Sequence, residues 1–314
     1  MGVKYRAMLG SPSNRYRFWR AAAAVLLALG AVPAFAQNQA PATNGAAAVA
    51  AAPADKARAW LGPDKRPLPF ASDEDVLEFL RTARVVSIEQ VPVGITAPQK
   101  VTLEKDGVRA HAHFSSIDED KALVTLRDGK REMGFRDSHR FNCAAYGLAR
   151  LLGLDNVPPA ALRTVSGKRG TLSLWIEDSF TEKDRIKQNI QLARPQEWVR
   201  QKLNMQVFDA LIYNTDRNQG NILIDSNWKI WMIDHTRAFR RQNTLQDPER
   251  ITGAGRKLLA RLRAVTDKEI QESVKPHLTG METEAILKRR VKLVSLIDKL
   301  VAEKGENAVL FTED

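Results

Sequence analysis

Short hydrophobic runs of strand length dominate the chain between residues 85 and 176. The sequence predicts strands over 85–88, 100–103, 108–114, 123–126, 162–165 and 171–176. Lys105-Asp106-Gly107 separates the second and third runs and suits a tight hairpin turn, and a turn containing Gly167 separates the last two. This part of the chain is therefore expected to form an antiparallel sheet.

Helical periodicity marks other parts of the chain. Phe141, Ala145, Leu148 and Leu152 recur at helical spacing, and Gly153 can end this helix of about 138–152. Further helices are predicted over 72–80, 195–213, 255–264, 267–277 and 282–304. After Phe239 the chain is expected to be helical to its end. Together the patterns predict an α+β protein with two lobes, a sheet lobe over 57–177 and a mostly helical lobe over 178–314.

The first 36 residues have the pattern of a secretory signal peptide. A basic stretch ends at Arg20, an apolar run covers 21–32, and Ala34-Phe35-Ala36 is a small-x-small cleavage pattern. We expect export to the periplasm or the outside of the cell, with an uncleaved membrane anchor as the alternative. Residues 37–56 form an Ala/Pro linker that is expected to be disordered.

Charge and cysteine content narrow the function classes. The net charge is +11, but residues 1–36 hold five of these charges, so the remainder carries about +6. A solvated basic surface accounts for this excess better than nucleic-acid binding does. Cys143 is the only cysteine, so no internal disulfide can form, and its helical apolar setting predicts a buried structural residue.

The most informative segment runs from Asn214 to Asp234. Asp216 and Asn221 are five residues apart, and Asp234 follows Asn221 by thirteen, with a predicted hairpin of 222–224 and 229–233 between them. Phosphoryl transfer needs a carboxylate to orient the attacking group and oxygen ligands for a magnesium ion. Taken singly, these residues are ordinary turn and cap residues. Their joint spacing instead favours a catalytic and metal-binding set.

These residues resemble those of the atypical kinases. The stretches DRNQGNIL (216–223) and IDHTRAF (233–239) are similar to the phosphatidylinositol 3- and 4-kinases, the HipA-type kinases and the secretory-pathway casein kinases. Residues 141–146, 151–154 and 157–159 are similar to the last group and its bacterial relatives, and the resemblance covers about 95–240. It implies a two-lobed protein-kinase-like fold, with Asp216 as catalytic base and Asn221 and Asp234 as metal ligands. ATP with Mg²⁺ or Mn²⁺ is the implied cofactor.

The sheet lobe departs from the family pattern. Ser115 stands where the family's phosphate-binding lysine is expected, and Asn142 stands at the best match for that lysine's glutamate partner. Lys100, Lys105 or Lys121 could substitute, and Lys100 could reach in from the neighbouring strand. The lone Gly94 is weak support for a phosphate-binding loop.

Three further residues are candidates for the nucleotide site. His113 and Ser115 share one strand face and either line the pocket or lie on the surface. Arg217 is expected to pair with a phosphate or with a neighbouring acid. Two functions remain: an ATP-dependent phosphotransferase acting on a protein or small hydroxyl-bearing substrate, or a nucleotide-binding or inactive pseudokinase scaffold. The sequence does not identify the substrate or partner.

Overall fold

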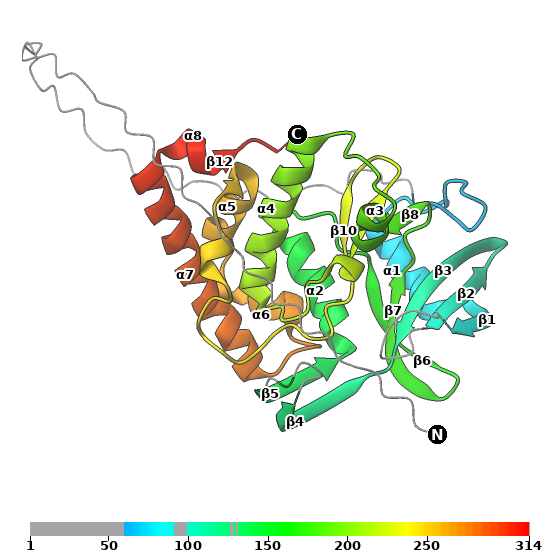
Figure 1. The fold of residues 1–314 in the computed structure, drawn as a ribbon. Coiled ribbons are helices and arrows are strands. Elements are labelled where there is room, and N and C mark those ends of the chain that lie inside the picture. The colour runs from blue at the N-terminus through cyan, green and yellow to red at the C-terminus, as the bar shows by residue number, and fades with distance from the viewer. Residues whose placement is uncertain (1–59, 91–98, 126–128, 130, 314) are drawn as a thin grey trace, which may run out of the picture. The chain divides into compact units, whose positions relative to one another are not determined.

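The computed structural model describes residues 60–90, 99–125, 129 and 131–313. The predicted signal peptide, the predicted linker and Gly94 lie outside these residues, so their predictions stay untested. The described chain joins a sheet lobe to a helical lobe (Figure 1). One continuous hydrophobic core runs through both. The α+β, two-lobed prediction is confirmed.

A five-stranded antiparallel sheet forms the first lobe. Its strands are β1 (Arg84–Gln90), β2 (Gln99–Lys105), β3 (Val108–Ser115), β6 (Ala160–Val165) and β7 (Lys168–Leu174), in the order β1-β2-β3-β7-β6. Two tight turns set the register, because Asp106, Gly107, Ser166 and Gly167 all adopt positive φ. Both predicted hairpins are therefore confirmed, and they align β3 with β7 at the centre of the sheet.

Two helices belong to this lobe. Helix α1 (Asp73–Thr82) begins with a capping box, in which Ser72 Oγ accepts from the Asp75 N–H and the Asp75 carboxylate accepts from the Ser72 N–H. Helix α2 (Arg140–Leu151) packs on β6 and β7 and also on α6 (Asp267–Val274) of the other lobe. Gly147 allows this close packing, since a Cβ there would lie 2.7 Å from the Ser273 carbonyl oxygen.

A separate two-stranded hairpin follows β3 and precedes α2 in the sequence. It consists of β4 (Asp118–Thr125) and β5 (Arg131–Ser138). A strand at 123–126 was predicted, but β5 was not, because Gly134 interrupts its pattern and the strand is polar. Phe135 to Ser138 are buried, so the end of β5 enters the interior next to α2.

The helical lobe follows β7 along the chain. It contains β8 (Ser179–Thr181), α3 (Glu182–Lys187), α4 (Pro195–Ile212), β9 (Ile222–Asp225), β10 (Ile230–Met232), α5 (Arg256–Ala264), α6, α7 (Gly280–Lys304) and α8 (Glu306–Val309), with short 3₁₀ turns at Gln219–Asn221 and Pro248–Arg250. Strands β8, β9 and β10 form a small antiparallel sheet. Capping boxes at Thr266 and Thr279 start α6 and α7.

Two expectations for the helical lobe need correction. Residues 178–195 were interpreted as polar chain, but β8 and α3 form there because Thr181 caps the helix with a hydrogen bond from the Asp184 N–H. The chain after Phe239 is not helical throughout. Residues 240–253 are largely irregular, and Ala254–Gly255 (β11) pairs in parallel with Leu310–Phe311 (β12) near the end of the described chain.

Two smaller observations bear on the predictions. Cys143 is buried, and burial raises the pKa of its thiol to about 12, as a structural cysteine requires. Among the described residues, no helix combines the length and the apolar character needed to cross a membrane.

Candidate functional site

The loop that carries Asp216 follows helix α4. Tyr213 ends α4 in the left-handed conformation, and Asn214 then holds the turn. The Asn214 Oδ1 accepts from the Asp216 N–H at 3.1 Å, while its Nδ2 donates to Asp209 Oδ1 at 2.9 Å. The Asp216 side chain is 38% exposed, so its carboxylate faces a space that solvent can reach. We call residues 214–221 the Asp216 loop.

Asn221 closes this loop and opens the hairpin. Its Nδ2 donates to the Asp216 carbonyl at 2.9 Å. Its carbonyl oxygen accepts from the Ile233 N–H at 3.2 Å across the hairpin. Asp234 therefore comes directly after the residue that pairs with Asn221, as the hairpin prediction required.

Asp234 has an unusual backbone conformation. Its φ is +52°, which non-glycine residues seldom adopt. The Asp234 Oδ1 accepts from the Thr236 hydroxyl at 2.9 Å, which fixes the carboxylate on its own turn. Strain of this kind concentrates at functional sites.

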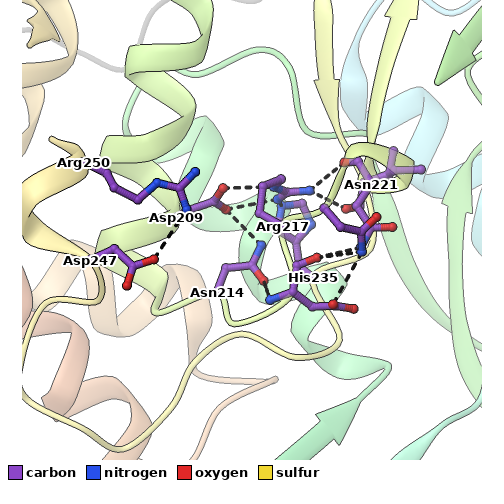
Figure 2. A network of polar contacts seen from close by, with 10 residues as sticks. Asp209, Asn214, Arg217, Asn221, His235, Asp247 and Arg250 are labelled. Atoms are coloured by element: carbon purple, nitrogen blue, oxygen red, sulfur yellow. Dashed lines mark hydrogen bonds and ion pairs between the residues drawn. The ribbon is translucent and has the colours of Figure 1, made fainter. Parts of the chain in front are cut away.

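Arg217 lies at the centre of a polar network that includes Asp209, Asn221 and His235 (Figure 2). Its Nε and Nη2 donate to the Asp209 carboxylate at 2.9 and 3.1 Å, and its Nη1 donates to the carbonyls of Asn221 and Ile233, both at 2.7 Å. Its Nη2 also donates to His235 Nε2 at 2.9 Å. All five N–H groups of the guanidinium are used. Of the two roles expected for Arg217, the structure shows pairing with an acid.

Electrostatics distinguish the groups in this cluster. Burial raises the pKa of Asp216, the nearby Arg237 guanidinium opposes this, and the Asp234 carboxylate adds to it. His235 is buried beside Arg217, and both effects hold its pKa well below the usual value. The imidazole is therefore neutral and can accept the hydrogen bond from Arg217. A carboxylate with a raised pKa in a polar cluster is a candidate general base.

Comparison with solved structures decides the fold. Hydra Fam20, solved with sugar, superposes with a TM-score of 0.60 at 14% identity, covering 76% of this chain and 92% of that one. Golgi casein kinase superposes with a TM-score of 0.57 at 14% identity, covering 76% of this chain and 78% of that one. The Golgi casein kinase with Mn/ADP bound superposes with a TM-score of 0.55 at 15% identity, covering 77% of this chain and 80% of that one.

The chain has an atypical protein-kinase-like fold. No family profile and no curated protein matches it in sequence. At this level of identity the likeness establishes the fold and leaves the activity to the residues of the site.

The candidate residues of the sheet lobe, His113, Ser115 and Lys100, lie on β3 and β2. His113 and Ser115 lie on the partly exposed face of β3, opposite buried Ala112 and Phe114, so the predicted shared face is confirmed. Burial lowers the pKa of His113, and the Asp234 carboxylate partly opposes this shift. His113 thus lies within electrostatic range of Asp234. Lys100 pairs with His113 across the ladder, and its ammonium lies 4.7 Å from the centre of the Trp175 ring.

The other two candidate lysines have partners on the surface. Lys105 lies 3.6 Å from Glu78 and donates to the Thr82 hydroxyl, and Lys121 pairs with Glu119 at 2.6 Å. Asn142 has a backbone partner, since its Oδ1 accepts from the His235 N–H at 2.9 Å. In the part of the chain that the structure describes, no lysine pairs with an acid on α2.

Sequence reasoning missed three charged residues beside the site. Arg237 lies 3.9 Å from Asp216 Oδ1 and donates to Glu132 of β5 at 2.9 Å. Asp137, also on β5, is 6% exposed, and burial raises the pKa of its carboxyl. Arg237 belongs to the stretch 233–239 that resembles the atypical kinases, so its closeness to the site could have been predicted from the sequence. Glu132 and Asp137 could not, because no hydrophobic pattern identified β5 as a strand.

The oxygen donors suit a hard divalent cation. Among the described residues, Asp234 Oδ2 and Asn221 Oδ1 accept no hydrogen bond, so both atoms are available as ligands. No group of three or more histidine, cysteine or acidic side chains within the described ranges could hold a metal ion. A site with one carboxylate and one amide would need further oxygen ligands from phosphate and water, which is how magnesium is commonly bound. The residues present therefore fit a nucleotide-bound metal.

Proposed function

We propose that the protein is an ATP-dependent phosphotransferase that acts on a hydroxyl group of a protein or small molecule. One observation carries this proposal. The segments that carry Asp216, Asn221 and Asp234 meet at one end of the β9–β10 hairpin, where the Arg217 guanidinium donates to the Asn221 and Ile233 carbonyls and the Asn221 amide donates to the Asp216 carbonyl. The kinase-like fold, and the Mn/ADP of one structural neighbour, support the assignment of nucleotide and metal.

Each residue has a defined part in this proposal. Asn221 and Asp234 would hold Mg²⁺ or Mn²⁺, which when bound shields the charge of the phosphates. Asp216 would accept a hydrogen bond from the substrate hydroxyl and take its proton during transfer. Arg237, close to the Asp216 carboxylate, opposes the rise in the pKa of that carboxyl that burial causes.

A nucleotide-binding scaffold without turnover is the second candidate. It is favoured by Ser115 and Asn142, because neither can supply the charge-assisted contact that a lysine–glutamate pair gives to a triphosphate. The two candidates share the metal site and differ only in turnover.

We also propose that the chain is exported, on the strength of the basic, apolar and Ala34-Phe35-Ala36 segments. Expression of the full chain with a periplasmic and a cytoplasmic reporter fused to its end tests this. Activity of the cytoplasmic reporter alone would contradict export.

Transfer of label from γ-labelled ATP, with Mg²⁺ or Mn²⁺, tests the catalytic proposal. We expect label on the protein itself or on an acceptor in a hydroxyl-bearing substrate panel. Asp216→Asn should reduce transfer by about 10²–10⁴-fold, the range of a lost general base. Glu249→Gln, which removes an exposed carboxylate away from the site, should leave it unchanged. Equal transfer by wild type and Asp216→Asn would overturn the proposal, and nucleotide binding without any transfer would select the scaffold.

A further inference from the structure

A cavity lies beside the Asp216 loop. It has a volume of about 680 Å³ and lies between α3, α4, the loop and residues 246–251. Asp216, Asn221 and Asp234 do not line it. In Figure 2, Asp247 and Arg250 lie on one side of Arg217 and Asn221 lies on the other. A ligand of this cavity would therefore occupy a site distinct from the proposed metal site.

The charges around this cavity do not cancel. Asp209 is neutralised by Arg217, and Asp247 lies 3.5 Å from Arg250. Lys183 of α3 and Lys202 of α4 also line the cavity, and within the described residues neither makes an ion pair or a side-chain hydrogen bond. Lys202 is partly exposed and Lys183 is exposed, so both can reach a ligand at the mouth of the cavity. The lining is left with two unneutralised cations.

Neutral amide groups also line the cavity. Gln206 and Gln219 belong to its wall, and within the described residues neither side chain makes a hydrogen bond. A side-chain amide offers a ligand both donors and an acceptor. A matching ligand therefore carries hydroxyl groups in addition to negative charge.

We propose that this cavity binds a small hydroxylated organic anion, with a phosphate or carboxylate held by Lys183 and Lys202 and hydroxyl groups held by the amides of Gln206 and Gln219. The cavity volume falls within the range of small-molecule sites, about 300–1,000 Å³. Because the same loop forms one wall of the cavity and carries Asp216, the ligand would contact the back of the proposed catalytic loop. This site does not depend on nucleotide binding.

Isothermal titration of the full chain with glucose 6-phosphate, gluconate and inorganic phosphate tests the proposal. A metal-free Tris buffer with about 0.15 M NaCl screens weak surface attraction. We expect saturable binding of glucose 6-phosphate or gluconate, and weaker binding of inorganic phosphate because it lacks carbon-borne hydroxyls. The stronger of the two organic ligands identifies the anionic group.

Variants locate the binding. Lys202→Gln and Lys183→Gln should each weaken binding by about tenfold, since each removes a charge-assisted contact. Lys187→Gln, on the same helix as Lys183 but outside the cavity lining, should leave it within about twofold. Asp234→Asn should bind as wild type does. No saturation by any of the three ligands up to about 10 mM would overturn the proposal. Equal losses in Lys187→Gln and Lys202→Gln, or loss only in Asp234→Asn, would also overturn it.

Discussion

The two walls of the proposed nucleotide site are held in different ways. On the helical side, the guanidinium of Arg217, whose side chain is 9% exposed, binds Asp209, two hairpin carbonyls and His235. On the other side, the β4–β5 hairpin makes several contacts, among them those of Glu132, whose side chain is 20% exposed and pairs with Arg237 and Arg240. The comparison teaches that the candidate metal-binding segment is fixed by one buried group, whereas β5 is held by several separate contacts.

The largest effect should come from Arg217→Met. This change leaves Asp209 and the two carbonyls without their donor, and breaking such a buried pair costs about 3–5 kcal/mol. Urea unfolding of the purified protein gives the free energy directly. Arg250→Met serves as control, because its ion pair is exposed and should contribute less than about 1 kcal/mol. Equal losses in the two variants would show that the helical wall is not held by Arg217.

Glu132→Gln should have an intermediate effect. The variant weakens contacts to Arg237 at 2.9 Å and Arg240 at 2.5 Å, and hydrogen bonds to charged groups contribute about 1.5–3 kcal/mol. The same unfolding measurement applies. Glu119→Gln breaks only the exposed pair with Lys121 and should change stability little. A Glu132→Gln loss as large as that of Arg217→Met would remove the distinction between the walls.

His235→Gln should alter the pH dependence of stability. The folded protein holds the pKa of His235 well below its usual value, so between that pKa and about 6.5 the unfolded state binds the extra proton. Stability that is present above pH 6.5 is therefore lost as the pH falls through this window, by about 1 kcal/mol between about pH 7.5 and 5.5. Glutamine can still accept from Arg217.

Unfolding curves at the two pH values measure this difference. The variant should lose about that much less stability than wild type on acidification, since the other histidines are common to both proteins. If wild type and variant lost the same stability between the two pH values, His235 would take up a proton in the folded state. The hydrogen bond from Arg217 to His235 would then be wrong.

The smallest effect should come from Lys100→Gln on nucleotide affinity. Lys100 is partly exposed, and an ion pair with a phosphate there would contribute about 0.2–1 kcal/mol, a loss of up to about fivefold. Lys105→Gln should have no effect, because Lys105 lies beside Glu78 and Thr82. Titrating each variant with ADP in the presence of Mn²⁺ compares their nucleotide affinities. A loss in Lys105→Gln alone would reverse the choice of lysine.

The two walls also differ in how far sequence predicts them. Asp216, Asn221 and Asp234 lie in one short segment around the β9–β10 hairpin, so their spacing could be recognised in the sequence, and local turn chemistry fixed the β2–β3 and β6–β7 hairpins. Asp137 and Glu132 contact residues about a hundred positions away, and the polar strand β5 gives no hydrophobic alternation from which to predict it. The role of Arg217 required the geometry, since spacing allowed either a phosphate or an acid as its partner.

Metal-dependent nucleotide binding tests the central claim most directly. The melting temperature would be measured with ADP alone, with Mn²⁺ alone and with both, for wild type, Asp234→Asn and Glu249→Gln. The account predicts stabilisation of about 2.7 kcal/mol at a hundredfold excess over the dissociation constant, only when both are present. Asp234→Asn should abolish it and Glu249→Gln should retain it. Unchanged melting of wild type with ADP and Mn²⁺, or equal stabilisation of Asp234→Asn, would contradict a metal site at Asn221 and Asp234.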